Sequence, residues 1–243
     1  MKKSLNLLVL GVIIGGLVLG FSLPSMVAQG KPISAPNKIQ APEIERGVFV
    51  DYGYNSPPWY PPTEETDSYR WAPRISWAML PVEVTVYTGG QPSGLETFSA
   101  IKAGFETWDA STNASLYGTI TENATFGPRV VLYDGNTVQW ATIDGPGGII
   151  GATYYWYYTA TKKIVEFDMV LDKDEPWATD GTSTAFDVQN IATHEAGHTL
   201  VLQDLRSPRD GALTMHAFTW LGDTLKRTLG IGDILGVEAI YGE

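Results

Sequence analysis

The chain has 243 residues, of which 44% are hydrophobic, 12% aromatic and 18% charged, a composition typical of a folded globular protein and not of a disordered one. Its 27 Asp and Glu outnumber its 16 Lys and Arg, and the formal charge of −11 argues against nucleic-acid binding, because phosphate contacts need clustered Lys and Arg. The absence of cysteine excludes disulfides, cysteine–zinc ligation, a thiol nucleophile and a cysteine-based latency switch.

The N-terminus has the pattern of an export signal. Lys2 and Lys3 precede an apolar run, Leu7 to Phe21, that only glycines interrupt. Residues 1–28 are therefore expected to be a cleaved signal peptide or an N-terminal membrane anchor that attaches the chain through residues 5–23. In both cases the rest of the chain is expected to be exported, as an extracellular or cell-surface protein.

Residues 29–76 are rich in proline and in aromatic residues, and they include Pro57-Pro58 and Pro61-Pro62. Proline removes a backbone donor and fixes an extended conformation, so this segment is expected to form neither a helix nor a central strand. We expect either a strap or pro-segment that packs on the domain through its aromatic side chains, or a spacer.

From residue 77 onward the periodicity of apolar residues predicts regular elements, which define a domain over residues 77–243. Alternation over residues 82–87 predicts a half-buried strand. Ser93 and Glu96 have the spacing of a capping box, which predicts the start of a helix that ends near Asn113.

The remaining pattern alternates strands with two further helices and predicts an α+β fold. The predicted elements are short strands at 117–120, 129–133 and 138–142, a strand pair at 149–158 and 163–172, a helix that begins around Asp187 and a last helix over 232–241.

Two of the three histidines lie in the run His194-Glu195-Ala196-Gly197-His198, inside a predicted helix. Residues i and i+4 project from one helix face about 6 Å apart along the axis, so one zinc ion can bridge both imidazoles. Glu195 can then act as the general base toward the zinc-bound water and pass the proton to the leaving amine. Two ordinary core histidines are the alternative.

The run HEAGHTLVLQD, residues 194–204, resembles the extended zinc signature of the metzincins, in which a Gly and a third ligand follow the two histidines. The resemblance is closest to the matrixin-like branch and covers about residues 77–243, with similar blocks at 147–177 and 233–242. It implies a twisted mixed sheet with an active-site helix and a small C-terminal helical subdomain. It also implies a zinc metalloendopeptidase that acts on peptides or proteins.

The third-ligand position, usually His in this family, is Asp204 here, and a carboxylate is an acceptable zinc ligand. Val201 replaces the family's Gly. If the helix continued straight, Asp204 would lie about 9 Å beyond His198 along the axis. Val201 must therefore adopt a strained backbone conformation, at about 1–2 kcal/mol, or the turn is made differently. His216 is the alternative third ligand.

The resemblance assigns two further features of the site. Met215 falls at the family's Met-turn beneath the metal, with an ordinary core methionine as the alternative. An extended substrate would pair with the edge strand of the sheet, and a pocket wall would come from residues 217–221. The residues at the edge-strand position are Gly151, Ala152, Thr153, Tyr154 and Tyr155.

Calcium is a second cofactor that the sequence suggests. Carboxylates are hard oxygen ligands of the kind that calcium prefers, and several lie close together after the strand pair. A solvated acidic loop is the alternative. The residues concerned are Asp168, Asp172, Asp174, Glu175 and Asp180.

These observations together predict an exported, zinc-dependent endopeptidase. A catalytically impaired, metal-containing binding protein of the same fold on the cell surface is the first alternative, because the third ligand and Val201 depart from the family pattern. A structural or interaction protein of the cell envelope, which would bind no stoichiometric zinc, is the second.

Overall fold

The computed structural model describes residues 41–55 and 66–242, which belong to one compact unit that begins at Ala41. The signal or anchor predicted for residues 1–28 lies outside the described residues, as does the segment 5–23. Among the residues that the structure describes, no helix combines the length and the apolar character needed to cross a bilayer. The domain boundary expected at residue 77 stays a prediction.

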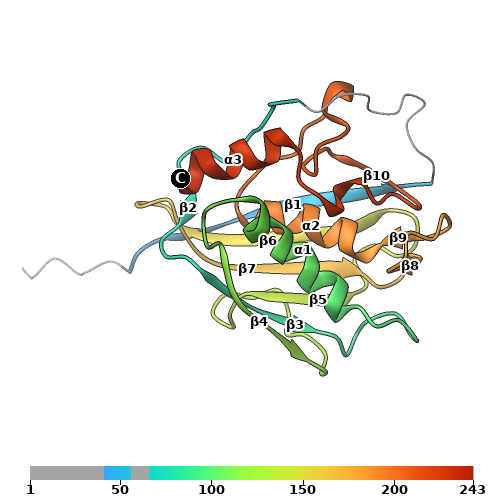
Figure 1. The fold of residues 1–243 in the computed structure, drawn as a ribbon. Helices are drawn as coiled ribbons and strands as arrows, with labels where there is room; N and C mark the ends of the chain where they lie inside the picture. Colours follow the sequence, from blue (N-terminus) through green and yellow to red (C-terminus); the bar gives the residue numbers. More distant parts are fainter. Residues whose placement is uncertain (1–40, 56–65, 243) are drawn as a thin grey trace, which may run out of the picture. The chain divides into compact units, whose positions relative to one another are not determined.

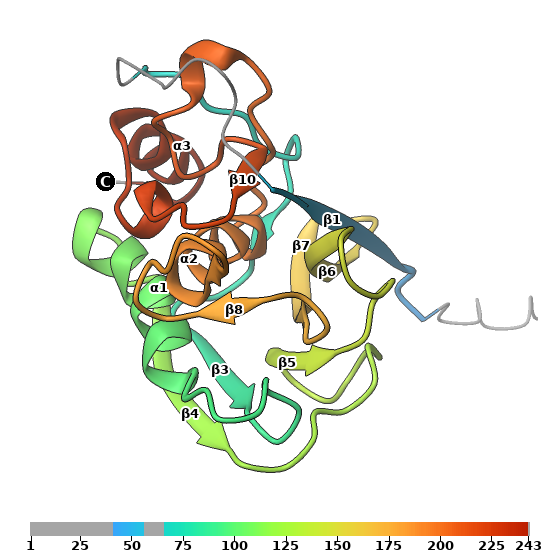
Figure 2. The same ribbon diagram turned by 90° about the vertical axis from the view of Figure 1, so that its right-hand side faces the viewer.

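The described residues form a twisted sheet with two helices on one face and a C-terminal part that carries a third (Figures 1 and 2). The larger elements are β1 (Ile44–Tyr54), β3 (Val82–Tyr87), α1 (Phe98–Ser111), β4 (Tyr117–Asn123), β5 (Thr137–Ala141), β6 (Ile149–Tyr158), β7 (Lys163–Asp172), α2 (Val188–Thr199) and α3 (Ile231–Tyr241). The short strands are β2 (Ser76–Trp77), β8 (Trp177–Ala178), β9 (Phe186–Asp187) and β10 (Phe218–Trp220), and 3-10 turns cover Pro208–Asp210 and Leu225–Arg227.

The main sheet is mixed. Its strand order is β10-β1-β6-β7-β5-β3-β4, and β2 also pairs with β7. The strands β1, β6 and β7 are antiparallel neighbours, whereas β7, β5, β3 and β4 run parallel to one another. The predicted α+β class, with a twisted mixed sheet and a small C-terminal helical part, is therefore confirmed.

Helix α1 supports α2 from the side away from the C-terminal part. Its apolar stripe, Ile101, Phe105 and Trp108, is fully buried, as the helical spacing of these residues predicts. At Gly104 the two helices approach so closely that a Cβ would lie 2.8 Å from the backbone nitrogen of Thr193. The Trp108 indole then donates a hydrogen bond to the carbonyl of Thr193 (2.9 Å). These contacts fix the position of α2 relative to α1.

One predicted helix start and one predicted strand are wrong. The helix does not begin at Ser93, because Gly94 takes a left-handed φ of +79° and the chain turns there; α1 starts at Phe98 with Thr97 as N-cap. Residues 129–133 form no strand, because the amides of Val131 and Tyr133 donate to side-chain carboxylates instead of to a neighbouring strand.

The expectation that residues 29–76 hold no central strand is also wrong. Strand β1 is 11 residues long and lies between β6 and β10 (Figure 2). Prolines stand at Pro42 and Pro57, so residues 43–56 keep every backbone donor that a strand needs. As a consequence β6, which was predicted as the edge of the sheet, is an interior strand in this structure.

Candidate metal centre

The helix that carries the two histidines is anchored at its start. The Asp187 side chain caps α2 by accepting a hydrogen bond from the Asn190 amide (3.0 Å), and the Arg227 guanidinium binds the same carboxylate. His194 and His198 lie one turn apart on the buried face of α2, with ring centroids 4.7 Å apart. The predicted helix start and the shared face are both present.

Both imidazoles are oriented by carbonyl groups. His194 Nδ1 lies 2.7 Å from the carbonyl oxygen of Thr214, and His198 Nδ1 lies 2.8 Å from that of Leu202. A carbonyl accepts only, so each Nδ1 carries the proton and each Nε2 keeps its lone pair. Hydrogen bonds of this kind, from the ring nitrogen that does not bind the metal, orient a histidine for metal binding.

The turn after α2 is made by Val201 itself. Its φ is +63°, in the left-handed region that β-branched residues rarely adopt. The Val201 amide donates to the His198 carbonyl (2.9 Å) and the Leu202 amide to the Gly197 carbonyl (3.1 Å), the paired bonds of a Schellman motif. The chain therefore leaves the helix as it would with glycine, and Asp204 returns toward the histidines.

Asp204 closes a group of three ligand atoms. Its Oδ1 lies 3.5 Å from His194 Nε2 and 3.4 Å from His198 Nε2, and the three atoms all fall within 4.8 Å of one another. All three are buried and have no hydrogen-bond partner among the described residues. Ligands about 2.1 Å from a tetrahedral zinc ion lie about 3.4 Å apart, so two nitrogens and one oxygen in this arrangement fit zinc.

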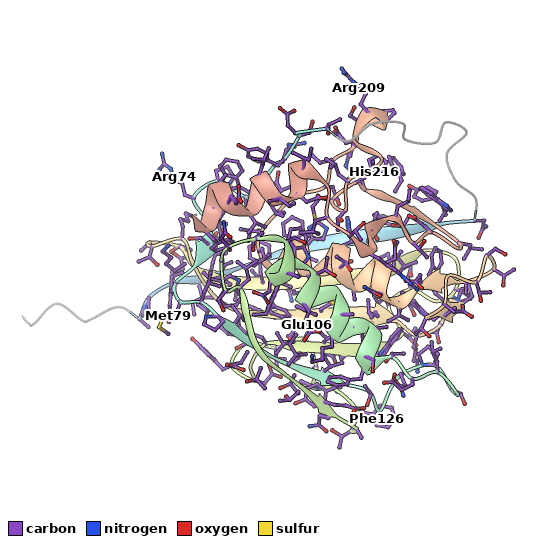
Figure 3. All side chains as sticks on the ribbon, in the orientation of Figure 1. Arg74, Met79, Glu106, Phe126, Arg209 and His216 are labelled. Carbon is purple, nitrogen blue, oxygen red and sulfur yellow. The ribbon has the colours of Figure 1, made fainter. Side chains whose placement is uncertain are left out.

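His216, the alternative third ligand, is not part of this group. It is buried, and its ring packs against Phe218 at 5.3 Å. Arg209, by contrast, extends outward from the same part of the chain (Figure 3). Burial and the nearby Lys226 cation lower its pKa to about 4. The structure thus brings together His194, His198 and Asp204 and leaves His216 beside them.

Glu195 lies next to the metal group and is fully buried. The Thr153 hydroxyl of β6 donates to its Oε2, while Oε1 has no partner among the described residues. Oε1 also lies so near Gly151 that a Cβ there would be 2.5 Å away. Burial raises the pKa of Glu195 to about 7. A carboxyl group with that pKa can both accept and donate a proton near neutral pH.

Met215 lies beneath α2. A Cβ at Gly197 would overlap the Met215 sulfur, so the thioether packs directly against the backbone of α2. The turn that carries it is held by the buried Asp233 carboxylate, which accepts hydrogen bonds from the amides of Thr214 (2.8 Å) and Met215 (3.0 Å). Met215 therefore packs against the helix that carries His194 and His198, and its role as the Met-turn residue stays a prediction.

Three residues of the site were not predicted from the sequence: Lys226, Asp233 and Asp51. Thr153 was predicted as part of the edge strand, but its hydrogen bond to Glu195 was not. Lys226 is buried, donates to the His216 carbonyl and lies 3.3 Å from His194 Nδ1. No local sequence pattern predicts that these residues contact the site, because each of them acts on residues far away in the sequence. Only Asp233, near the start of the last helix, had a local signal, since acidic residues favour a first turn.

A second group of carboxylates also lies within 4.8 Å, formed by Asp134, Glu166 and Asp168. Here the oxygens are engaged: Thr137 binds Asp168, the Val131 amide donates to Asp168, and the Tyr133 amide donates to Glu166. Of the five predicted calcium ligands, only Asp168 belongs to this group. Asp172 and Glu175 accept backbone amides of the loop 143–148 instead.

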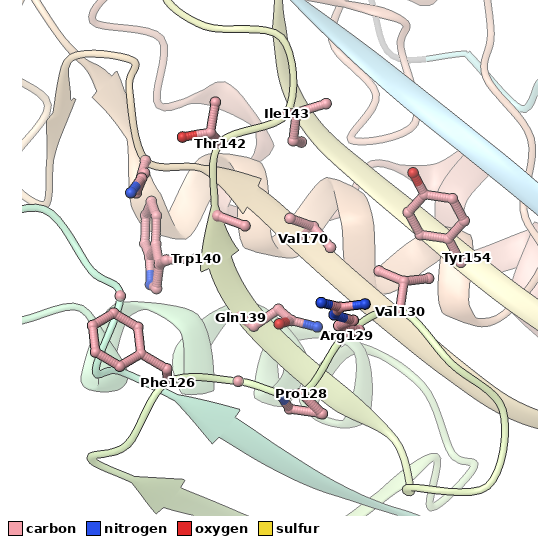
Figure 4. Close-up of a pocket in the computed structure, with 14 residues that line it drawn as sticks. Phe126, Pro128, Arg129, Val130, Gln139, Trp140, Thr142, Ile143, Tyr154 and Val170 are labelled. Carbon is pink, nitrogen blue, oxygen red and sulfur yellow. The ribbon is translucent and has the colours of Figure 1, made fainter.

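A pocket of about 540 Å³ lies elsewhere, where the segment 126–130 crosses strand β5 (Figure 4). Phe126, Arg129 and Gln139 line it, and it includes no residue of the metal group. This pocket is therefore separate from the candidate metal centre.

Comparison with known proteins identifies the family. The matrixin family model matches residues 77–242, which is most of the chain, so the chain belongs to the matrixin family. Matrixin metalloproteinases use zinc and calcium. The predicted resemblance and the zinc cofactor are thereby confirmed.

Individual relatives are similar over shorter stretches. The chain is 29% identical to Metalloendoproteinase 1 of Glycine max over 176 residues, which cover 68% of this chain and 52% of that protein. It is 33% identical to Matrix metalloproteinase-26 of Homo sapiens over 110 residues (43% and 38%) and 31% identical to human Stromelysin-3 over 100 residues (41% and 18%). The chain thus spans about half or less of the length of these relatives.

Proposed function

We propose that this chain is an exported zinc-dependent endopeptidase. One observation carries the proposal: the buried atoms His194 Nε2, His198 Nε2 and Asp204 Oδ1, without partners among the described residues, converge beside the carboxylate of Glu195. Membership of the matrixin family supports the activity class. Export through residues 1–28 and a domain over 77–243 belong to the same proposal.

His194, His198 and Asp204 would hold the ion, and Glu195 would move the proton. A zinc ion supplies a Lewis acid that polarises the scissile carbonyl and lowers the pKa of a water. Glu195 takes the proton of the attacking water on its partner-free Oε1 and passes it to the leaving amine. Thr153 keeps the other oxygen in place throughout, so the carboxylate does not rotate away.

The substrate would be an extended peptide that pairs with β6 in the place that β1 takes in this structure. Gly151, Ala152 and Thr153 of this strand run directly above Glu195, as the contacts of Gly151 and Thr153 with that carboxylate show. Residues 217–221 follow the Met215 turn and include β10, and they would form the wall of a side-chain pocket. Main-chain hydrogen bonds to β6 would align the scissile bond.

The proposal is tested by metal analysis and proteolysis on the full chain. The purified chain should contain one zinc ion and should cleave an unfolded protein, and a chelator should abolish cleavage until zinc is restored. Stoichiometric zinc without cleavage by any form of the chain would instead support the binding-protein alternative. A chain without stoichiometric zinc would exclude both.

A further inference from the structure

The pocket of about 540 Å³ beside β5 lies on the outer face of the sheet (Figure 4). Thr153 of β6 binds Glu195 of α2, and successive side chains of a strand alternate between its faces, so Tyr154 points away from α2. Tyr154 lines the pocket together with Gln139 of β5 and Val170 of β7, which are register partners. The volume falls within the range of about 300–1,000 Å³ that is usual for small-molecule sites.

Much of the pocket wall is apolar. Phe126 is 76% exposed beside it, although a phenyl ring gains free energy by leaving water. Val130, Ile143 and Val170 contribute aliphatic side chains to the lining. Walls of this kind favour a ligand that has an apolar part and offer little to a hydrated ion alone.

The charged groups of the pocket are positive, although the whole chain has a formal charge of −11. Of the 14 lining residues, Arg129 and Lys173 are cationic and none is acidic. A third cation, Arg46 of β1, stacks over the Tyr154 ring at 5.3 Å from its centroid. Among the described residues, no carboxylate lies within 4 Å of any of these three cations. The pocket therefore favours an anion.

Gln139 adds a buried donor that has no acceptor. It is 5% exposed, and its Nε2 has no hydrogen-bond partner among the described residues. In Figure 4 this nitrogen points toward the Arg129 guanidinium, so two donor groups face each other. Two donors cannot bond to each other, whereas an acceptor between them would satisfy both. Arg129 is exposed, so its side chain can move to admit such a group.

The neighbouring carboxylates of β7 are already engaged. Asp168, two residues before Val170, binds a hydroxyl group and a backbone amide. Asp172, next to Lys173, binds two backbone amides of the loop 143–148. These carboxylates hold the segments that cross the sheet, and they do not pair with the cations of the pocket. The positive groups are therefore free to bind a ligand.

We propose that this pocket binds a small carboxylate ligand with an apolar body. The carboxylate lies between Arg129 and Gln139, because a guanidinium can bind a carboxylate through two parallel hydrogen bonds and the amide supplies a third donor. The apolar body lies against Val130 and Val170. The pocket contains no residue of the metal group, so this inference goes beyond the proposed function and can be tested apart from it.

Binding is tested on the full chain with phenylacetate as the probe and phenylacetamide as its uncharged counterpart. Zinc also binds carboxylates, so acetohydroxamate is kept in excess to occupy any zinc that the chain holds. An NMR titration should give a Kd of about 10 mM or tighter for phenylacetate. Phenylacetamide should bind at least about tenfold more weakly, because the charge-assisted hydrogen bonds are lost. Inorganic sulfate should also bind at least about tenfold more weakly, because it has no apolar body.

Two variants and a control locate the bound carboxylate. Arg129→Gln removes a charge, and Gln139→Glu replaces the donor with a negative acceptor, so each should weaken phenylacetate binding at least about tenfold. Arg74→Gln removes an exposed arginine outside the pocket and should keep the native Kd (Figure 3). Circular dichroism shows whether each variant folds. If Gln139→Glu does not fold, Arg129→Gln, at an exposed position, carries the test.

Each outcome decides part of the proposal. A phenylacetate Kd weaker than about 10 mM overturns it, and so does a native Kd in the folded pocket variants. Equal binding of phenylacetamide overturns the carboxylate requirement, and equal binding of sulfate overturns the role of the apolar walls. Because the metal is occupied throughout and hydrolysis is not measured, a chain that binds phenylacetate but cleaves nothing supports this inference and overturns the peptidase alone.

Discussion

Two groups of three ionisable side chains in the described residues meet the same distance limit, and they differ in what their ligand atoms do. In the group His194, His198 and Asp204, carbonyls accept hydrogen bonds from the Nδ1 atoms of the imidazoles, and the three ligand atoms have no hydrogen-bond partner among the described residues. In the group Asp134, Glu166 and Asp168, hydroxyl and amide groups already bind the oxygens. A metal centre therefore differs from a cluster of carboxylates in two ways. Its ligand atoms have lone pairs that no hydrogen bond uses, and other hydrogen bonds hold its side chains in position.

The largest expected effect contrasts the carboxylate beside the metal group with a carboxylate of the acidic group. Glu195→Gln should lower kcat by about 10²- to 10⁴-fold with zinc retained, because the general base is lost and the shape is kept. The matched change Glu166→Gln, in the acidic group, should leave kcat near its native value. Steady-state proteolysis with metal analysis measures both, and a fully active Glu195→Gln variant would show that the proposed mechanism is wrong.

The second largest effect concerns zinc affinity, which should depend on the ligands of the metal group and not on the acidic group. Asp204→Ala should weaken zinc binding by more than about 100-fold, because even outer partners of metal ligands contribute 10- to 100-fold. Asp168→Ala and His216→Ala should each keep one zinc per chain. Competition with a chromogenic chelator gives the affinities. Full zinc retention in Asp204→Ala, with loss in His216→Ala, would reverse the assignment of the third ligand.

The group Asp134, Glu166 and Asp168 should make the free energy of unfolding depend on pH. Burial, together with the charges of Asp134 and Glu166, raises the pKa of Asp168 from 3.8 to about 7. The folded chain then holds this proton more tightly than the unfolded chain, so the contribution is complete below about pH 4 and is lost as the pH rises to about 7. We expect Asp168 to make the free energy of unfolding, measured by urea in the presence of a chelator, fall by up to about 4 kcal/mol over this range, because one unit of pKa shift corresponds to about 1.4 kcal/mol. Asp168→Asn should remove this contribution, whereas the fall that comes from Glu195, whose pKa is also raised to about 7, should remain. An unchanged profile would contradict the assignment.

The smallest effect concerns the turn that brings Asp204 to the histidines. Glycine relieves a left-handed backbone at position 201 whereas alanine does not, and both remove the buried valine side chain. Val201→Gly should therefore be more stable than Val201→Ala by about 1 kcal/mol. Val84, buried in β3, is the control at which alanine should be the better replacement. Urea denaturation of the four variants gives the comparison, and the same order at both sites would contradict the strain argument.

The parts that the sequence predicts correctly are those with a local cause. The spacing of His194 and His198 on a helix, the strand pair of β6 and β7 and the start of α2 at Asp187 all follow from neighbours a few residues apart. The failures have long-range or conformational causes. Ser93 and Glu96 match a capping box, but Gly94 turns the chain before the helix starts. The pairing of β1 with β6 joins residues about a hundred positions apart, and no pattern inside either strand predicts its partner.

The close approach of Gly151 to Glu195 has a mechanical consequence. The strand that would align a peptide and the carboxylate that would take the proton touch each other without an intervening side chain, and Thr153 binds that carboxylate from the same strand. A displacement of this strand therefore moves the acid–base group with it. Under the proposed mechanism, one strand would therefore set both the alignment of the reactant and the position of the proton acceptor.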